Sequence, residues 1–341
     1  MVARRAAGTE TSARLTDVAR RAGVSTMTVA RVLRQPEKVA PATRARVSAA
    51  LDAAQYTPDL VARALASRRS GTIGAVVPTL SNSLIAEVIQ GMSDELALTG
   101  RQLILGASGF SAAREEALVR TFLARRVDGL YLTGTSHTEA TLRLLRAATI
   151  PVVEGGNLTD DPIQLVVGAS NVEAAAAVVR HLIARHGTDV AFVGASPVDN
   201  DRMRDRRVGY ARAMAEASAK PRAGRSVECP LTMVGGREAM ARLLALKQPP
   251  RAVFCATDVI AVGAVQECVR RGVQVPGTIA IAGYDDLDVA RELVPALTTV
   301  RMPRYEIGQT AARLIDRCLA GEPPAQRIHD LGFEFVPRES G

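Results

Sequence analysis

The 341-residue sequence has no tryptophan, and aromatic residues make up only 3% of it. So few rings disfavour a protein that stacks single-stranded nucleic acid bases on an aromatic platform. No run of about 18 apolar residues occurs, so we expect no membrane-spanning helix. The first 12 residues contain no apolar segment of the kind that a secretory signal needs, which favours a cytoplasmic protein.

Cysteine and histidine are also scarce, with four of each. The cysteines form no C-x-x-C pair and have no histidine cluster nearby, so the sequence favours neither a metal site nor a disulfide framework. Cys255 and Cys268 lie in apolar stretches and are expected to be buried thiols. The histidines are far apart in the sequence, and each is expected to be a surface or capping residue. They are His137, His181, His186 and His329. We therefore expect no metal and no other cofactor.

Motifs of common enzyme classes are missing as well. The expected strand and turn at 77–81 lack G-x-G-x-x-G, and no G-x-x-x-x-G-K-[ST] occurs in the chain. Ser108 does not lie in a G-x-S-x-G elbow. These absences disfavour an enzyme.

The positive charge is concentrated at one end of the chain. The net charge is +8, and residues 1–70 hold 13 Lys/Arg against five Asp/Glu, so that segment carries the whole excess. A polyanion such as duplex DNA is the natural partner of so local a field, although a solvated basic tail would give the same composition.

Residues 14–56 have the pattern of three short helices. The first is expected at Leu15–Arg21, and the turn that follows contains Gly23. Ser25 is a good N-cap for the second helix, and Pro41 suits the first turn of the third. Two helices joined by a tight glycine-containing turn are typical of a helix-turn-helix.

From Thr72 onward, short β-rich runs alternate with amphipathic stretches, which is the pattern of parallel α/β sheets. Expected strands are Ile73–Val77, Leu103–Leu105, Gly129–Leu132, Val152–Val153, Val190–Val193, Ala252–Cys255 and Ile279–Ala282. Expected helices are Leu84–Leu98, Ala112–Arg126, Val172–Arg185, Arg204–Ala215, Gly236–Leu246 and Val259–Arg271. The alternation occurs before and after about residue 162, which predicts two lobes with a ligand cleft at the carboxyl ends of their strands.

These patterns divide the chain into four parts. We expect a disordered tail at 1–13, a helix-turn-helix domain at 14–58, a linker at 59–71 that could form two helical turns, and a two-lobed ligand-binding domain at 72–341. A sugar-binding transport protein would share the two lobes. It would also need a signal peptide and would lack the basic helical head.

The residues themselves resemble those of the LacI/GalR family of repressors. The resemblance rests on the stretches 15–25 and 28–33, on Tyr56-Thr57-Pro58 with Ala62-Arg63-Ala64-Leu65, on 281–286 and on 295–300. It covers the chain beyond residue 13, with the motifs in the family's order. It implies a three-helix DNA-binding head, a hinge helix and a sensor domain that is similar to periplasmic binding proteins and has parallel sheets.

The resemblance places the second helix of the head in the major groove of DNA. Thr26, Met27 and Arg31 are then expected to contact base edges, with Arg31 as a bidentate donor to guanine. Core packing of Met27 and simple phosphate contact or solvation of Arg31 are the alternatives. Thr28 and the backbone around Ser25 are expected to hold phosphates, and Thr16 and Arg34 are further expected DNA-binding residues.

The hinge adds a contact in the minor groove by the same resemblance. Leu65 corresponds to the leucine that the family inserts at a central pyrimidine–purine step, with Arg63 flanking it. Packing of Leu65 against the sensor domain is the alternative. Ala30 and Ala40 depart from the family's usual serines, which removes one expected phosphate contact and one helix N-cap. Arg14 stands where the family often has a capping threonine.

The family's sensor clefts bind sugars, nucleobases or related metabolites. Correspondence assigns seven residues to the effector site: Asn82, Leu84, Glu154, Arg202, Arg206, Thr257 and Asp285. Arg202 and Arg206 are four residues apart, so on a helix they would share one face and could bind a carboxylate or phosphate. A solvated basic face is the alternative for this pair. Thr257 replaces the family's usual asparagine, and Glu154 could face either the cleft or the lobe junction.

Several stretches are most similar to the gluconate-operon repressor branch of the family. They are 27–29, 36–39, 78–82, 134–138 and 150–154. The resemblance therefore implies a sugar-acid effector such as gluconate or 6-phosphogluconate, with a neutral sugar or a nucleobase as the alternative. It also implies a homodimer on a near-palindromic double-stranded operator, with no membrane partner.

Overall fold

The computed structural model describes residues 14–56, 69–81 and 83–341, and for Arg34 it describes the backbone only. These residues form two compact units, which divide between Ser70 and Gly71. Within the described ranges, no helix is both long and apolar enough to cross a membrane.

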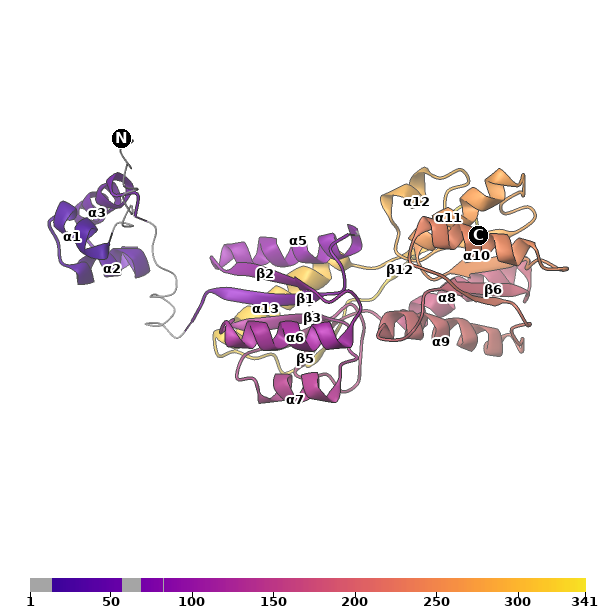
Figure 1. Cartoon of the computed structure of the whole chain (residues 1–341), viewed down its shortest axis with the longest axis horizontal. Helices are drawn as coiled ribbons and strands as arrows, with labels where there is room; N and C mark the ends of the chain where they lie inside the picture. Colours follow the sequence, from indigo (N-terminus) through magenta and orange to yellow (C-terminus); the bar gives the residue numbers. More distant parts are fainter. Residues whose placement is uncertain (1–13, 57–68, 82) are drawn as a thin grey trace, which may run out of the picture. The chain divides into compact units, whose positions relative to one another are not determined.

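The first unit is a head of three α-helices around a small apolar core (Figure 1). The helices and a short 3₁₀ turn are α1 Leu15–Ala22, α2 Thr26–Arg34, η1 Pro36–Lys38 and α3 Pro41–Ala53. Val18, Val29 and Val47 are fully buried at its centre. Gly23 ends α1 with a φ of 64°, a left-handed conformation in which glycine has no steric penalty. The three expected helices and their turn are confirmed.

The second unit has two lobes, and lobe 1 is built on a six-stranded parallel sheet of order β11-β5-β4-β3-β1-β2. Helices α5 and α13 pack on one face of the sheet, and α6 and α7 pack on the other. The strands are β1 Thr72–Val77, β2 Gln102–Ala107, β3 Gly129–Thr133, β4 Val152–Gly155, β5 Leu165–Gly168 and β11 Ile328–Asp330. The helices are α5 Ser83–Leu98, α6 Ala112–Ala124, α7 Glu139–Ala147 and α13 Arg304–Leu319.

Lobe 2 has a four-stranded parallel sheet of order β7-β6-β8-β9, covered by α8 and α9 on one face and by α10 and α11 on the other. Its strands are β6 Val190–Gly194, β7 Ser226–Glu228, β8 Ala252–Cys255 and β9 Ala280–Ala282. Its helices are α8 Asn171–His186, α9 Asp201–Glu216, α10 Met233–Leu244, α11 Asp258–Arg270 and α12 Asp288–Glu292. An antiparallel pair, β10 Thr299–Arg301 and β12 Glu334–Val336, packs against α8.

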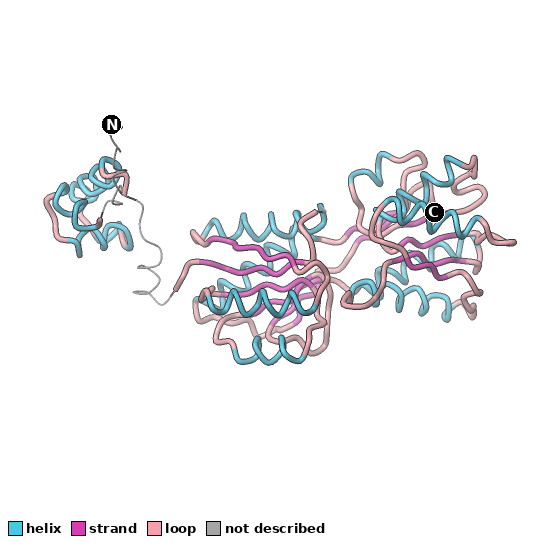
Figure 2. The backbone as a smooth tube through the Cα atoms, viewed as in Figure 1, coloured by secondary structure: helices cyan, strands magenta, loops and turns pink. Residues whose placement is uncertain are grey.

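The chain order and the lobes do not coincide, which corrects the expected division at about residue 162. Strand β5 still belongs to lobe 1, and the chain returns from lobe 2 to lobe 1 to form α13 and β11 before β12 pairs with β10 (Figure 1). Figure 2 shows the two lobes as separate sets of strands flanked by helices. Helix α13 can lie close to α5 because both have glycine at the contact. A Cβ on Gly308 would lie 1.9 Å from the carbonyl oxygen of Val88, and one on Gly91 would lie 2.1 Å from that of Tyr305. Lobe 1 is therefore incomplete without the C-terminal part of the chain.

Side-chain caps begin many helices at the carboxyl end of the preceding strand. Ser111, Thr138, Ser170, Asn200 and Thr257 each accept a hydrogen bond from a backbone N–H in the first turn of the following helix. Such caps satisfy N–H groups that the helix leaves free. They also place polar side chains at the strand ends, where α/β folds bind ligands.

Candidate functional site

The first turn of α2 forms an exposed polar face on the head. Ser25 is the N-cap: its Oγ accepts a hydrogen bond from the Thr28 N–H at 3.1 Å and lies 2.9 Å from the Thr28 hydroxyl. Thr26 and Arg31 are exposed, and Met27 is 71% exposed. A methionine so exposed is not part of the core, so the core-packing alternative for Met27 is wrong.

The remaining head and hinge residues are described to different extents. Thr16 is exposed on α1. The Arg34 side chain, Arg63 and Leu65 lie outside the described residues, so their roles remain predictions. Arg14 and Ala40, which replace the family's usual capping residues, both lie at helix N-termini in the structure.

The N-caps of α1 and α3 differ in how well they bind the first turn of their helix. Ala40 is the N-cap of α3 and makes no side-chain cap. Arg14 caps α1 through its backbone, because its N–H donates to the Asp17 carboxylate at 3.1 Å. The first helix thus has a substitute cap from within the turn, whereas the third has lost its cap.

In the second unit, a cavity of about 120 Å³ lies between the two lobes at the ends of their strands. Five of the seven expected effector residues line it: Leu84, Arg202, Arg206, Thr257 and Asp285. A second cavity of about 200 Å³ shares Thr133, Asn200 and Arg202 with the first and continues toward His137. Asn82 lies outside the described residues, and Glu154 lines neither cavity.

Arg206 is buried and rigidly held in lobe 2. Its Nε donates to Asn171 Oδ1 at 3.0 Å, and its Nη1 donates to the Ala256 carbonyl at 2.7 Å. The guanidinium carbon lies 3.7 Å from the centroid of the Tyr284 ring, a cation–π arrangement. The third nitrogen, Nη2, is 3.6 Å from Asp285 Oδ1. The solvated-face alternative is therefore wrong for Arg206, which is a preorganised cation at the cavity wall.

Asp285 is 1% exposed and has an unusual backbone, with a φ of 128°. Arg304 holds it: Nη2 of that arginine donates to the Asp285 carbonyl at 2.6 Å and to Oδ1 at 3.1 Å. A non-glycine residue in this region of φ is strained, and such strain persists where the surroundings fix it, often at ligand sites. The strained backbone, together with Arg206 and Arg304, orients the Asp285 carboxylate toward the cavity.

Arg202 lies in the first turn of α9, which begins at Asp201 and so includes both predicted arginines. Its Nη1 donates to Asp201 Oδ1 at 2.9 Å, and its side chain is largely buried. Because Arg202 and Arg206 line the same cavity, the prediction that they share one face of a helix is confirmed.

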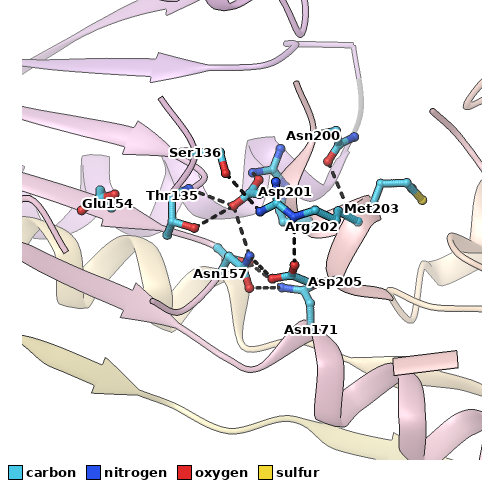
Figure 3. A network of polar contacts seen from close by, with 12 residues as sticks. Thr135, Ser136, Glu154, Asn157, Asn171, Asn200, Asp201, Arg202, Met203 and Asp205 are labelled. Atoms are coloured by element: carbon cyan, nitrogen blue, oxygen red, sulfur yellow. Dashed lines mark hydrogen bonds and ion pairs between the residues drawn. The ribbon is translucent and has the colours of Figure 1, made fainter. Parts of the chain in front are cut away.

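A network of buried polar groups joins the lobes beside this cavity (Figure 3). Asp201 of lobe 2 accepts hydrogen bonds from the Thr135 N–H at 2.8 Å, the Thr135 hydroxyl at 3.0 Å and Asn157 Nδ2 at 3.1 Å, all in lobe 1. Asn171 continues the network: its Nδ2 donates to Asn157 Oδ1 at 3.1 Å, and its Oδ1 accepts from Arg206. The contact between the lobes is thus connected directly to the arginine in the cavity wall.

Glu154 lies behind the second cavity, paired with His137. Its Oε1 is 3.4 Å from His137 Nε2, and its Oε2 accepts from the Ile163 N–H at 2.6 Å. Glu115 contacts the other ring nitrogen, Nδ1, at 2.6 Å. Burial opposes the charge on His137, but the two carboxylates outweigh it and raise the pKa to about 9. The expectation of a surface or capping residue is therefore wrong for His137, which is a buried cation.

Sequence reasoning missed several cavity residues. Tyr131, Thr133 and Arg304 line the cavity, and Asn171 orients Arg206. Tyr131 could have been found from the sequence. It lies in the apolar strand Gly129–Thr133, and a buried tyrosine hydroxyl needs a hydrogen-bond partner, which a ligand can supply. Arg304 and Asn171 had no comparable local signal.

Thr257 is the N-cap of α11, and its hydroxyl oxygen accepts from the Ile260 N–H at 3.3 Å. Its O–H proton remains available to a neighbour in the cavity. Cys255 and Cys268 are buried, as expected. Within the described ranges, no group of three or more His, Cys, Asp or Glu side chains is arranged to hold a metal ion.

Comparison with known proteins identifies both units. Residues 14–59 match the model for bacterial regulatory proteins of the lacI family, and residues 179–341 match that for a periplasmic binding protein-like domain. The transcriptional regulator GntR of Escherichia coli K12 is 35% identical over 325 residues, which cover 95% of this chain and 97% of the relative.

Solved structures agree. The transcription regulator GntR from Chromobacterium violaceum is 36% identical, with a TM-score of 0.75 over 79% of this chain and 98% of that one. The lac repressor dimer bound to operator and an anti-inducer is 25% identical, with a TM-score of 0.87 over 97% of this chain and 99% of that one. The chain therefore belongs to the lacI family of DNA-binding transcriptional regulators and is not an enzyme.

Proposed function

We propose that this regulator is a repressor whose operator affinity is controlled by a sugar acid such as gluconate or 6-phosphogluconate. The observation that carries the proposal is the lining of the 120 Å³ cavity, where Arg202 and Arg206 stand beside the carboxylate of Asp285. Arginines bind carboxylates and phosphates in paired geometry, and a buried carboxylate accepts hydrogen bonds from ligand hydroxyls. A polyhydroxy acid offers both kinds of group.

The charges of the cavity support an acidic rather than a neutral ligand. Arg202, Arg206 and Arg304 line it, against a single carboxylate, that of Asp285. Asp201 pairs with Arg202 and Glu87 pairs with Arg304 from outside the lining. An acid would still give the guanidiniums at the cavity wall an anionic partner with charge-assisted hydrogen bonds, which a neutral sugar cannot offer. The sequence resemblance to the gluconate-operon repressor branch supports the same class of effector.

Titration calorimetry on the full chain tests the effector. Gluconate and 6-phosphogluconate are compared with glucose, and with the nucleobase hypoxanthine as a second neutral class. We expect binding of at least one acid and weak or no binding of the neutral compounds. Binding of glucose or hypoxanthine alone would overturn the proposal.

For the head, we propose that Thr26, Met27 and Arg31 contact base edges in the major groove. Their exposure on the first turns of α2 supports this role, because that surface of the helix is free of core contacts. Ser25 and Thr28 at the helix N-terminus suit a phosphate, since free N–H groups and the helix dipole favour an anion there. Thr16, Arg34, Arg63 and the minor-groove residue Leu65 complete the proposed surface.

Operator binding by variants tests these assignments. Arg31→Ala is expected to lower affinity for the operator about 5- to 150-fold while barely changing non-specific binding, as is typical of one lost bidentate base contact. Leu65→Ala should likewise reduce specific more than non-specific binding. Arg120→Ala, on the surface of lobe 1, is the control. Equal losses on specific and non-specific DNA would contradict the base-reading role.

We further propose that the protein acts as a homodimer that uses the edge strand β2. Ile104 and Leu105 on this strand are each 37% exposed, and β2 pairs with β1 on one side only. An apolar strand edge is a template for pairing and is normally covered. A second copy of the chain suits it, because a near-palindromic operator needs two heads. Sedimentation of Ile104→Lys tests this: we expect dissociation to monomers, and an unchanged dimer would contradict it.

Effector binding is proposed to act through the polar network between the lobes. A ligand at Arg206 changes the partners of Asn171, which is bonded to Asn157 in the other lobe. A shift between the lobes would move the dimer interface and destabilise the hinge helices. Whether the effector releases or recruits the operator depends on which lobe arrangement it prefers.

A further inference from the structure

Three buried polar atoms at the lobe cavity make no hydrogen bond to the described part of the chain, apart from the contact between the Tyr131 and Thr133 hydroxyls. They are the hydroxyl oxygens of Tyr131 and Thr133 and the Oδ2 atom of Asp285. Buried polar groups in proteins are nearly always hydrogen-bonded, and each exception costs stability. Three exceptions around one cavity indicate groups that are held for a ligand.

The backbone leaves room for these groups through glycines. A Cβ on Gly155, in the neighbouring strand β4, would lie 2.5 Å from the Tyr131 hydroxyl oxygen. A Cβ on Gly134 would lie 2.7 Å from Arg202 Nη1. Any side chain at these two positions would displace the tyrosine tip or the guanidinium. The placement of both groups therefore depends on the absence of a side chain at two strand ends.

The unpartnered groups differ in what they can bind. Tyr131 and Thr133 come from the same strand, β3, and their hydroxyls can donate; Arg202 lines the same cavity and adds a positive charge. Burial raises the pKa of Tyr131 to about 12, so its hydroxyl keeps the proton that it would donate. Asp285 Oδ2 belongs to lobe 2 and can only accept when ionised.

We propose that Tyr131 and Thr133, together with Arg202, bind the acidic group of the effector, and that Asp285 Oδ2 accepts from its hydroxyls. The inference rests on the proposed sugar-acid function and gives the ligand an orientation. The anion meets two hydroxyl donors and one cation in lobe 1 and at the start of α9. The polyol chain then extends toward Asp285 and toward Arg206, whose Nε and Nη1 already donate to Asn171 and Ala256. Tyr131 and Thr133 thereby determine specificity for an acid over the matching neutral polyol.

Calorimetry on the full chain tests this with gluconate and glucitol, which differ only in a carboxylate or a hydroxymethyl group at one end. For Tyr131→Phe and Thr133→Val we expect roughly 10- to 100-fold weaker gluconate binding, the loss of a hydrogen bond to a charged group. Glucitol binding, already weak in the wild type, should change by no more than a few-fold. Unchanged gluconate affinity in both variants would overturn the inference while leaving the sugar-acid function intact.

Equal losses for gluconate and glucitol would also overturn it, because the hydroxyls would then bind the polyol chain. Failure of the wild-type protein to bind gluconate and 6-phosphogluconate would instead contradict the proposed function itself, and the acid assignment with it. These outcomes are distinguishable because the first two require a wild-type protein that binds the acid.

Thermal stability of the ligand-free protein gives a second readout. The Tyr131 hydroxyl has only the neighbouring Thr133 hydroxyl to lose, so Tyr131→Phe should change the melting temperature little. The matched control is Tyr210→Phe, outside the cavity, where the hydroxyl donates to the Val190 carbonyl at 2.9 Å and its loss should lower the melting temperature. A decrease in Tyr131→Phe equal to that in Tyr210→Phe would show a structural role and contradict the inference.

Discussion

The Asp201 carboxylate accepts a hydrogen bond from the Thr135 N–H at 2.8 Å, although the two residues belong to different lobes and lie 66 positions apart. Burial alone would raise the pKa of Asp201, but Arg202 and the hydrogen bonds from Thr135 and Asn157 hold it at about 2. The first residue of α9 is thus an ionised acceptor for the end of β3. The interface between the lobes is specified by this charge as well as by packing.

Replacing Asp201 by alanine should therefore destabilise the two-lobed unit. The change leaves Asn157 Nδ2 with fewer acceptors and Arg202 without its carboxylate, and removing one partner of a buried pair costs about 3–5 kcal/mol. Urea denaturation of the full chain measures it. Asp160→Ala, an exposed carboxylate in a loop of lobe 1, is the control and should change stability by less than about 0.5 kcal/mol. Equal effects of the two substitutions would contradict the conclusion that Asp201 stabilises the contact between the lobes.

His137 predicts a specific dependence of stability on pH. Its folded pKa of about 9 exceeds the ordinary value of 6.5, so the protonated ring stabilises the fold fully below pH 6.5. That contribution is lost as the pH rises through 9. From the two values, the wild type should lose on the order of 3 kcal/mol between pH 6.5 and 9.5.

His137→Gln should remove most of this dependence, because glutamine does not titrate. Urea denaturation at pH 6.5 and 9.5 gives the comparison. His329→Gln is the control, since its ring Nε2 bonds the Gln326 carbonyl and, among the residues that the structure describes, makes no ion pair with a carboxylate. If the free energy of unfolding of His137→Gln still falls as steeply as that of the wild type, the buried imidazolium is ruled out.

Asp258 predicts a second dependence in a lower pH window. Burial, and then the nearby charge of Asp285, raise its pKa from 3.8 to about 7. The unfolded chain ionises at 3.8 while the folded protein holds the proton, so stability decreases as the pH rises from 3.8 to 7 and stays reduced above 7.

Asp258→Asn should therefore stabilise the protein by a few kcal/mol at pH 8 relative to the wild type, and much less at pH 4.5. The amide oxygen can still accept from the Leu287 N–H, and the amide NH₂ can donate to the Thr299 hydroxyl, which now accepts instead of donating. Melting temperatures at the two pH values measure the difference. A constant offset between variant and wild type would disprove the ionisation argument.

The sequence predicted those elements whose formation depends on neighbouring residues, through capping or through a continuous apolar run. Helix caps such as Ser25 and buried strands such as Val190–Gly194 have recognisable patterns. The strands β5 and β11 are only four and three residues long and were missed. The return of α13 to lobe 1 was also missed, because its partner α5 lies more than 200 residues earlier and no local pattern encodes that contact.

The same limit applies to the site. Family resemblance identified Arg206 and Asp285, and the structure shows why they belong together. Asn171 of α8 bonds Arg206, Arg304 of α13 bonds Asp285, and Tyr284, next to Asp285 in the chain, packs its ring on Arg206. His137 was misjudged because its two carboxylates come from helix α6 and strand β4. Pairings between distant segments are a property of the fold, which the spacing of residues in the sequence does not reveal.

The missing cap of α3 gives a prediction of increased stability. Ala40 has non-helical backbone angles, φ −52° and ψ 138°, and no side chain that accepts from the first turn. A serine there could accept from an N–H of that turn, which is worth about 0.5–2 kcal/mol in comparable helices. Ala40→Ser should therefore raise the stability of the head by about 1 kcal/mol.

Hydrogen exchange of the α3 amides in the full chain measures this change without separating the head from the rest of the protein. Ala45→Ser is the matched control: the same substitution on an exposed position inside α3 should be slightly destabilising, because serine is a poorer helix former than alanine. Slower exchange in Ala40→Ser together with faster exchange in Ala45→Ser is the expected pair of results. If both variants exchange faster than the wild type, other groups already bind the N–H groups of the first turn of α3. The prediction that a side-chain cap stabilises the head would then be wrong.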